Sequence, residues 1–278
     1  MKKICVITMV RNDEFYLRKW VAYYGEQLGR ENLRVYFDGM DQQVPDFCEG
    51  VYTVLRPRVE GNVAKSDRGR INYLSDRAAE LFAQGYDMVI GTDVDEFIVV
   101  DPKLGMTLPE YLSGKDIRYS LSALGIDVGQ HLDKETAIDI NKPFLAQRSY
   151  GYLSSRYTKA SILGKPLRWG SGFHRVKGHD YHIAKDLYLF HLGGFDYERM
   201  KMKLKNSDLL STGWGKHLQR RAKTTYIVTR TKALEWDRTV CRMRFIQQWV
   251  RQFFAWNKPW NPIYKVVVRI PDRFKEIL

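Results

Sequence analysis

Residues 86–97, Tyr-Asp-Met-Val-Ile-Gly-Thr-Asp-Val-Asp-Glu-Phe, pass from an apolar run directly into acidic residues. The apolar part, residues 86–91, predicts a buried β-strand. If the backbone stays extended beyond it, Asp93 and Asp95 project to the same side, because side chains alternate along a strand. Two carboxylates that face one cation suit Mg²⁺ or Mn²⁺, with substrate phosphates and water as further ligands. The alternative is a turn in which Asp93 only caps the next segment.

Strand-like and helix-like patterns alternate along the first part of the chain. Strands are expected at residues 3–10, 33–37 and 51–55, and helices are expected from Asn12, as the N-cap, to about Gly29 and at residues 67–84. This alternation predicts an α/β fold with a mainly parallel sheet flanked by helices, whose ligand sites lie beyond the carboxyl ends of the strands. After Pro109 the strand-like pieces 117–124 and 187–191 are separated by loops, which predicts a mixed half that faces the substrate.

The composition excludes several classes of protein. A chain of 278 residues that is 44% hydrophobic and 28% charged is large enough to bury a core and is typical of folded proteins. No apolar run approaches the roughly 20 residues of a membrane-spanning helix, and the run at residues 4–10 lacks the features of a signal peptide. Cys5, Cys48 and Cys241 form no closely spaced pair. We therefore expect a cytosolic protein with reduced cysteines.

The excess positive charge lies at the C-terminal end. Residues 1–196 carry 26 Lys+Arg and 26 Asp+Glu, whereas residues 197–278 carry 19 Lys+Arg and 6 Asp+Glu. We expect a main domain at residues 1–200 and a basic, Trp-rich helical tail at residues 201–278 that meets an anionic partner. Apolar residues recur at helical spacing between Lys232 and Trp256, which predicts an amphipathic helix. Packing of this helix on the domain and binding at a membrane interface are both open alternatives.

Three segments resemble family-2-like glycosyltransferases. Residues 7–24 (Ile-Thr-Met-Val-Arg-Asn-Asp-Glu-Phe-Tyr-Leu-Arg-Lys-Trp-Val-Ala-Tyr-Tyr) look like the opening of that family, although Tyr24 stands in place of the usual His. Residues 35–39 resemble the segment of the second strand, and residues 87–97 resemble the block that ends in Asp-x-Asp-Glu-Phe. The resemblance extends over about residues 4–199. It implies a GT-A fold, a UDP- or GDP-linked sugar donor and a Mn²⁺ or Mg²⁺ ion.

The resemblance also implies roles for individual residues at the metal. Asp93 and Asp95 would hold the ion, and His191, at the end of the apolar run 187–190, is the best match for a late histidine that completes the metal site. Imidazole is the commonest metal-ligating side chain. A hydrogen-bonded core histidine is the equal alternative for His191.

Further residues are expected at the nucleotide sugar. By resemblance, Asp38 lies where the family contacts the base or ribose, and Arg11 and Asn12 border the nucleotide, as does Asp93. Lys65 and Arg68 lie near the start of the expected second helix, where their charge and the helix N-terminus favour phosphate. For Arg68, a solvated helix face is the equal alternative.

Two carboxylates are candidates for catalysis. Asp127, in Gly-Ile-Asp-Val-Gly at residues 125–129, is the candidate base that deprotonates the acceptor hydroxyl. Glu96 is a candidate acid near the donor sugar, or else it pairs with a neighbouring arginine.

The residues and the resemblance together favour a metal-dependent glycosyltransferase. We expect it to use a saccharide or lipid-linked saccharide acceptor in cell-surface polysaccharide or lipopolysaccharide synthesis, with the tail at an anionic membrane surface on the inner face of the cell membrane. A nucleotidyltransferase is the second enzyme hypothesis, but residues 10–14 after the first strand contain no glycine. A nucleic-acid-binding protein that uses the basic tail is the non-enzymatic alternative.

Overall fold

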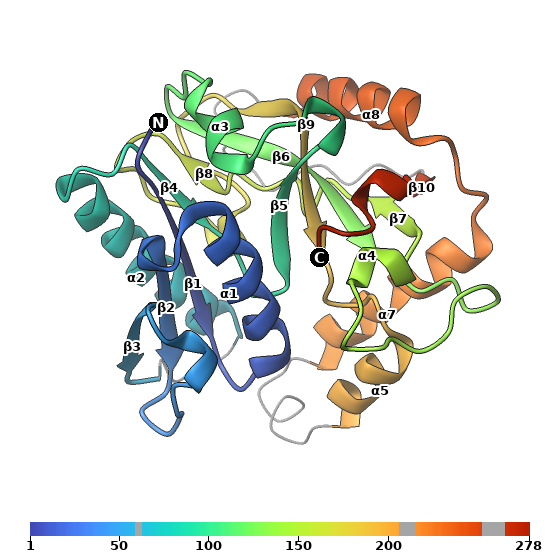
Figure 1. The fold of residues 1–278 in the computed structure, drawn as a ribbon, viewed down its shortest axis with the longest axis horizontal. Coiled ribbons are helices and arrows are strands. Elements are labelled where there is room, and N and C mark those ends of the chain that lie inside the picture. The colour runs from blue at the N-terminus through green and yellow to red at the C-terminus, as the bar shows by residue number, and fades with distance from the viewer. Residues whose placement is uncertain (59–62, 206–214, 252–264) are drawn as a thin grey trace.

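The computed structural model describes residues 1–58, 63–205, 215–251 and 265–278, and their strands form one sheet with helices packed against it (Figure 1). The strands are β1 (Ile4–Val10), β2 (Leu33–Asp38), β3 (Tyr52–Arg56), β4 (Met88–Gly91), β5 (Glu96–Val100), β6 (Ser120–Val128), β7 (Tyr150–Leu153), β8 (Ile162–Leu163), β9 (His182–His191) and β10 (Val267–Arg269). The helices are α1 (Glu14–Leu28), α2 (Val63–Ala83), α3 (Leu108–Ser113), α4 (Phe144–Gln147), α5 (Tyr197–Lys205), α7 (Gly215–Arg230) and α8 (Trp236–Val250).

The N-terminal half of the sheet is parallel. Strands β3, β2, β1 and β4 lie side by side in this order, and every pair among them is parallel. Every residue of β1 is buried, as the apolar run at residues 4–10 predicts for a central strand covered on both faces. The chain moves from β1 to β2 through α1, and from β3 back across the sheet to β4 through α2. Right-handed crossovers in opposite directions place α1 and α2 on opposite faces.

The second half of the sheet is mixed. Strand β8 joins β4 to β6, and β6 continues to β7 and β10, all by antiparallel pairing. Strand β9 runs parallel to β6 and antiparallel to β5. The predicted α/β fold with a sheet flanked by helices is confirmed, as are the strands expected near residues 3–10, 33–37, 51–55 and 86–91.

Two local predictions are wrong. Asn12 does not cap α1: the N-cap position is Asp13, and Asn12 instead takes a left-handed backbone conformation with φ of 49°. Residues 93–95 are not extended but form a turn, in which the Glu96 N–H donates to the Asp93 carbonyl at 3.1 Å. The turn is required because the chain leaves β4 and then pairs with β9 as β5.

The C-terminal segments contact the rest of the sheet. Strand β10 pairs with β7, and the amphipathic helix predicted after Lys232 is present as α8, which packs against β9 and β10. The boundary proposed at residue 200 stays a prediction. In the described parts of the chain, no helix has both the length and the apolar character needed to cross a bilayer.

Helix α1 holds the backbone around the acidic turn through three polar groups on one face. The Tyr16 hydroxyl donates to the Leu192 carbonyl at 2.7 Å, and Trp20 Nε1 donates to Thr92 Oγ1 at 2.9 Å. The third group is the hydroxyl of Tyr24, which accepts from Ile98 N–H at 2.9 Å. These residues are four apart and therefore lie on one face of the helix. The helix thus fixes both ends of the turn and the loop after β9.

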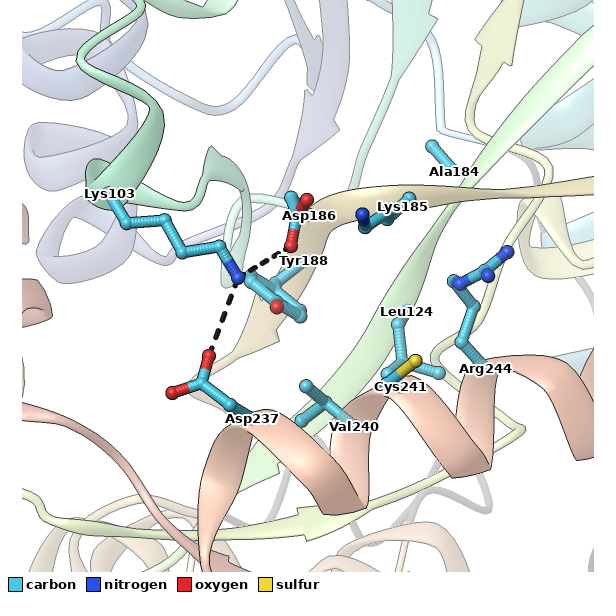
Figure 2. Close-up of a pocket in the computed structure, with 10 residues that line it drawn as sticks. All are labelled: Lys103, Leu124, Ala184, Lys185, Asp186, Tyr188, Asp237, Val240, Cys241 and Arg244. Atoms are coloured by element: carbon cyan, nitrogen blue, oxygen red, sulfur yellow. Dashed lines mark hydrogen bonds and ion pairs between the residues drawn. The ribbon is translucent and has the colours of Figure 1, made fainter.

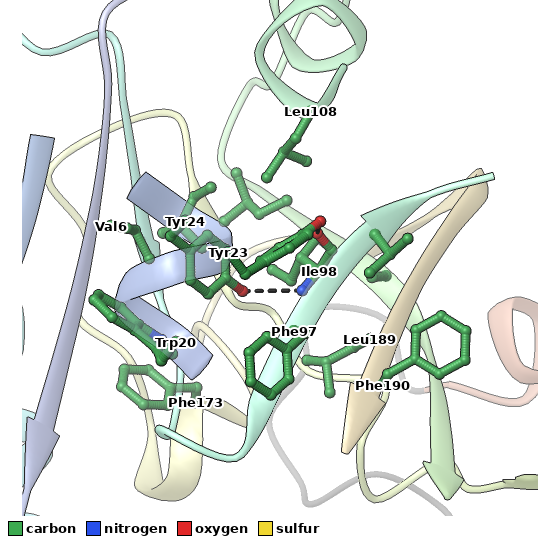
Figure 3. Packing of buried hydrophobic residues seen from close by; sticks show 14 of the residues in the cluster. Val6, Trp20, Tyr23, Tyr24, Phe97, Ile98, Leu108, Phe173, Leu189 and Phe190 are labelled. Carbon is green, nitrogen blue, oxygen red and sulfur yellow. Dashed lines mark hydrogen bonds between the residues drawn. The ribbon is translucent and has the colours of Figure 1, made fainter. Parts of the chain in front are cut away.

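The same face of α1 belongs to the hydrophobic core (Figure 3). Trp20 and Tyr24 are fully buried, and Tyr24 stacks on Phe97 of β5 with ring centroids 6.3 Å apart and an interplanar angle of 6°. Aromatic burial of this kind contributes a large part of core stability. The site described below therefore lies on a rigid support.

We predict that Tyr24→Phe destabilises the protein by about 1–3 kcal/mol, because the buried Ile98 N–H loses its acceptor. Tyr52→Phe is the matched control: it removes only a hydroxyl from an exposed ring on β3 and should change the free energy of unfolding by less than about 0.5 kcal/mol. Urea unfolding of both variants measures the difference. Equal stability of the two variants would contradict the role given to the Tyr24 hydroxyl.

Candidate functional site

Four carboxylates and a histidine meet where β4, β6 and β9 end. Asp93 and Asp95 come from the turn between β4 and β5, and Glu96 is the first residue of β5. His191 is the last residue of β9 and lies in register with Glu96 of β5 on one side and Asp127 of β6 on the other. The sheet therefore places all of these groups together at the edge where α/β folds bind ligands.

The imidazole of His191 is held on three sides. Its Nδ1 lies 2.7 Å from Asp127 Oδ1, and its Nε2 lies 3.4 Å from Asp95 Oδ2. The Tyr157 ring stacks on it with centroids 3.7 Å apart and an interplanar angle of 15°. Burial by itself lowers the pKa of His191, but the carboxylates of Asp95 and Asp127 outweigh it and raise this pKa to about 9. In the absence of another cation, His191 is therefore protonated at neutral pH.

Asp127 supports His191 and is itself supported. Its second oxygen, Oδ2, accepts a hydrogen bond of 2.5 Å from the Thr224 hydroxyl of α7. Both carboxylate oxygens of Asp127 are thus engaged, and its side chain is 8% exposed. A carboxylate bound to one imidazole nitrogen orients the ring and leaves the other nitrogen directed toward a ligand.

Glycine at position 193 lets the backbone lie close to the side chains of Asp95 and His191. A Cβ atom built on Gly193 would lie 2.6 Å from both Asp95 Oδ2 and His191 Nε2. The buried His191 Nε2 makes no hydrogen bond. A carboxylate oxygen and an imidazole nitrogen 3.4 Å apart are spaced as two neighbouring ligands of one Mn²⁺ ion, or of a Mg²⁺ ion whose other ligands are oxygen atoms.

Asp93 lies apart from this pair, although sequence reasoning placed it with Asp95. Asp93 Oδ1 is 2.5 Å from Arg70 Nη1, and Oδ2 is 2.9 Å from Lys159 Nζ. Burial favours the protonated acid, but the two cations prevail and hold the pKa of Asp93 well below its usual range. The turn at residues 93–95 separates the two aspartates. Within the described ranges, no three His, Cys, Asp or Glu side chains converge as metal ligands.

Lys159 compensates the negative charge of Glu96, which is fully buried. Its ammonium lies 2.5 Å from Glu96 Oε1, and the exposed fractions of the two side chains are 3% and 0%. Burial raises the pKa of Glu96 to about 7, and the opposing charge of Lys159 limits this rise. The neighbour of Glu96 is thus a lysine rather than the arginine expected as its alternative partner, and its position favours a structural role.

The residues expected at the nucleotide gather at the ends of β1 and β2. Arg11 Nη1 donates to the Asp38 carbonyl at 2.7 Å, and the Arg11 guanidinium pairs with Asp41 at 2.8 Å. The Asn12 N–H donates to Gln42 Oε1 at 2.9 Å. The structure therefore brings Arg11, Asn12 and Asp38 together beside the carboxyl edge of the parallel strands. Their contact with a nucleotide stays a prediction.

Helix α2 brings Arg70 to the carboxylates of the site. The contact of Lys65 and Arg68 with phosphate stays a prediction. Lys65 and Arg68 are both exposed, whereas Arg70 reaches Asp93. The sequence carries a partial signal for Arg70, because Asp67 lies three residues earlier in the same helix and pairs with it at 3.0 Å. Lys159 has no comparable local signal, because it is 66 residues from Asp93 in the chain. Sequence reasoning also missed Thr224.

Comparisons with known proteins give only distant structural similarities. No protein-family model and no curated protein sequence matches the chain. Among solved structures, the chain is similar to a protein described as a glucose-1-phosphate thymidylyltransferase from Bacillus anthracis, at 10% identity over 80% of this chain and 85% of that chain, with a TM-score of 0.29. It is also similar to a mannose-1-phosphate geranyltransferase from Thermus thermophilus, at 9% identity over 98% of this chain and 76% of that chain, with a TM-score of 0.29. Similarity at this level carries no conclusion about function, which is argued from the site alone.

We predict that Lys159→Met destabilises the protein by roughly 3–5 kcal/mol near neutral pH, because it leaves the buried Glu96 without its cation and the half-buried Asp93 with Arg70 alone. The loss should shrink as the pH falls. The folded pKa of Glu96 lies above the ordinary value of 4.5, so the folded protein takes up a proton there and removes one buried charge.

Guanidinium unfolding at several pH values measures this effect. The control is Lys201→Met, which breaks an exposed ion pair with Glu198 and should cost less than about 1 kcal/mol. A Lys159→Met cost that equals the control cost at every pH would contradict the compensating role of Lys159.

Proposed function

We propose that this chain is a metal-dependent glycosyltransferase with a GT-A-type site, which moves a sugar from a UDP- or GDP-linked donor to a saccharide or lipid-linked saccharide acceptor. The observation that carries the proposal is the pairing of Asp95 Oδ2 with His191 Nε2 at 3.4 Å, at the carboxyl edge of the sheet and opposite a glycine. The remaining ligands of the ion would be phosphate oxygens and water, as is usual for Mg²⁺. The resemblance of residues 7–24 and 87–97 to family-2-like glycosyltransferases agrees with this proposal.

The reaction needs positive charge where the sugar leaves, because negative charge builds on the departing phosphate oxygen. A Mn²⁺ or Mg²⁺ ion held by Asp95 and His191 would supply that charge as a Lewis acid. The chain's own contribution is to fix this pair of ligands. Asp127 and Thr224 orient the imidazole, and Gly193 has no side chain that would clash with Asp95 or His191.

Asp93 has a separate part in this proposal. It holds Arg70 and Lys159 in fixed positions next to the metal ligands. A guanidinium so placed adds positive potential for a diphosphate without itself being a metal ligand. Metal ligation by Asp93, expected from the sequence, stays a prediction that these contacts do not favour.

Neither candidate catalytic carboxylate has a free oxygen directed at an acceptor. Asp127 is engaged by His191 and Thr224, and Glu96 is fully buried against Lys159. We therefore assign Asp127 as a positioning residue for His191 and Glu96 as a structural residue.

The test is nucleotide release from a panel of nucleotide sugars in the presence of Mn²⁺. We predict release of a nucleoside diphosphate from one donor, and a fall to background in Asp95→Ala, because the variant removes a metal ligand. Asp272→Ala, which removes a carboxylate that is 77% exposed, should behave as the wild type. Unchanged release in Asp95→Ala would overturn the metal assignment, and release of pyrophosphate from a nucleoside triphosphate and a sugar phosphate would favour a nucleotidyltransferase.

Direct Mn²⁺ binding should depend on pH. The ion must displace the proton from His191, whose pKa is about 9 in the metal-free protein, so affinity should rise with pH by up to about tenfold per unit below that pKa. Asp127→Asn should weaken binding roughly 10- to 100-fold, because it loosens the imidazole. Electron paramagnetic resonance of free Mn²⁺ measures both effects. Affinity that is independent of pH and of Asp127 would contradict ligation by His191.

A further inference from the structure

Helix α8 has an apolar face on each side. Its inward face buries Trp236, Val240, Met243 and Gln247. On its outward face, the exposed fraction of Phe245 is 67% and that of Trp249 is 80%. Phe245 and Trp249 are one helical turn apart and therefore form one exposed apolar patch, and such patches mark interaction sites.

The orientation of α8 is fixed by contacts at its inward side. Lys103 Nζ lies 2.8 Å from Asp186 Oδ1 and 3.4 Å from Asp237 Oδ1, and so connects α8 to the end of β5 and to β9 (Figure 2). Val240 and Cys241 line a small cavity of about 70 Å³ in the same place. The helix therefore cannot turn to bury its outward rings on its own domain.

The exposed rings share their face with two arginines. Arg238 and Arg242 are exposed and precede Phe245 and Trp249 at steps of four, three and four residues, which places all four side chains along one stripe. No ion pair is found for the Arg238 and Arg242 side chains among the described residues, and we call these four residues the outer stripe.

The acidic residues at the start of α8, Glu235 and Asp237, are engaged elsewhere and do not pair with the arginines of the outer stripe in the described structure. Glu235 caps the helix by accepting from the N–H groups of Asp237 and Arg238, and Asp237 pairs with Lys103 and Arg273. Helix α8 itself carries three arginines and one aspartate, so its surface attracts anions.

We propose that the outer stripe docks on the surface of an anionic lipid bilayer. A helix that lies in the interface inserts aromatic side chains at the boundary between head groups and acyl chains, while arginines pair with lipid phosphates. A convex helix with two protruding rings fits a deformable lipid surface. Single-stranded nucleic acid also stacks on aromatic rings, but it is bound along a positively charged groove, whereas the outer stripe is the convex side of one helix. This inference goes beyond the proposed reaction and does not depend on it.

The experiment is co-sedimentation of the full chain with sucrose-loaded vesicles. We expect binding to phosphatidylcholine vesicles that contain phosphatidylglycerol and little binding to phosphatidylcholine alone. The double variant Phe245→Ser/Trp249→Ser should weaken the partition coefficient at least roughly tenfold, because it removes the inserted apolar area. Arg238→Gln/Arg242→Gln should weaken it roughly tenfold and reduce its dependence on salt.

Two controls make the result specific. Tyr52→Ser removes an exposed ring from β3, far from α8 in Figure 1, and should leave vesicle binding unchanged. Asp95→Ala should also bind as the wild type, which separates this inference from the proposed reaction. All altered side chains of the outer stripe are exposed, so the circular dichroism spectra of these variants should match that of the wild type.

Three outcomes would overturn the proposal. They are no preference for anionic vesicles, equal binding by the wild type and both outer-stripe variants, and a dimer in solution that dissociates in Phe245→Ser/Trp249→Ser without any vesicle binding. Salt-sensitive binding to single- or double-stranded DNA, lost in Arg238→Gln/Arg242→Gln and with no vesicle binding, would likewise replace a bilayer by nucleic acid.

Discussion

The arrangement of the site follows from the need to compensate carboxylates buried at one edge of the sheet. Asp95, Glu96 and Asp127 are each at most 5% exposed, and Asp93 adjoins them. Buried carboxylates without partners would cost several kcal/mol each. The chain meets this cost with two permanent cations, Arg70 and Lys159, on the side of Asp93 and Glu96. On the side of Asp95 and Asp127 it provides only His191, whose charge can be exchanged for that of a metal ion.

This division gives the two aspartates of the Asp-Val-Asp sequence different parts. One belongs to a fixed network of ion pairs, and the other faces a histidine whose second nitrogen has no hydrogen bond. Helix α1 keeps the two parts in place, because Tyr16, Trp20 and Tyr24 hold the backbone at Leu192, Thr92 and Ile98. The closely spaced aromatic residues of α1 thus have a physical explanation in the support of the site.

The sequence predicted those features that depend on local pattern. The parallel strands and the acidic strand end follow from apolar runs and from the position of polar residues at their ends, whereas the approach of His191 to Asp95 was expected from the family resemblance. The separation of Asp93 from Asp95 could not be predicted, because it depends on the pairing of β5 with β9, almost a hundred residues further along the chain. The burial of Lys159 at the site could not be predicted for the same reason. Its partners are distant in sequence, and a lysine in a loop is ordinarily solvated.

The most direct measurement is a crystal structure of the protein with Mn²⁺ and UDP or GDP, with data collected at the manganese absorption edge. We predict an anomalous peak within bonding distance of Asp95 Oδ2 and His191 Nε2, with Asp93 still paired to Lys159. An ion held by Asp93 in place of Lys159, or no ion while the diphosphate is bound elsewhere, would contradict the account.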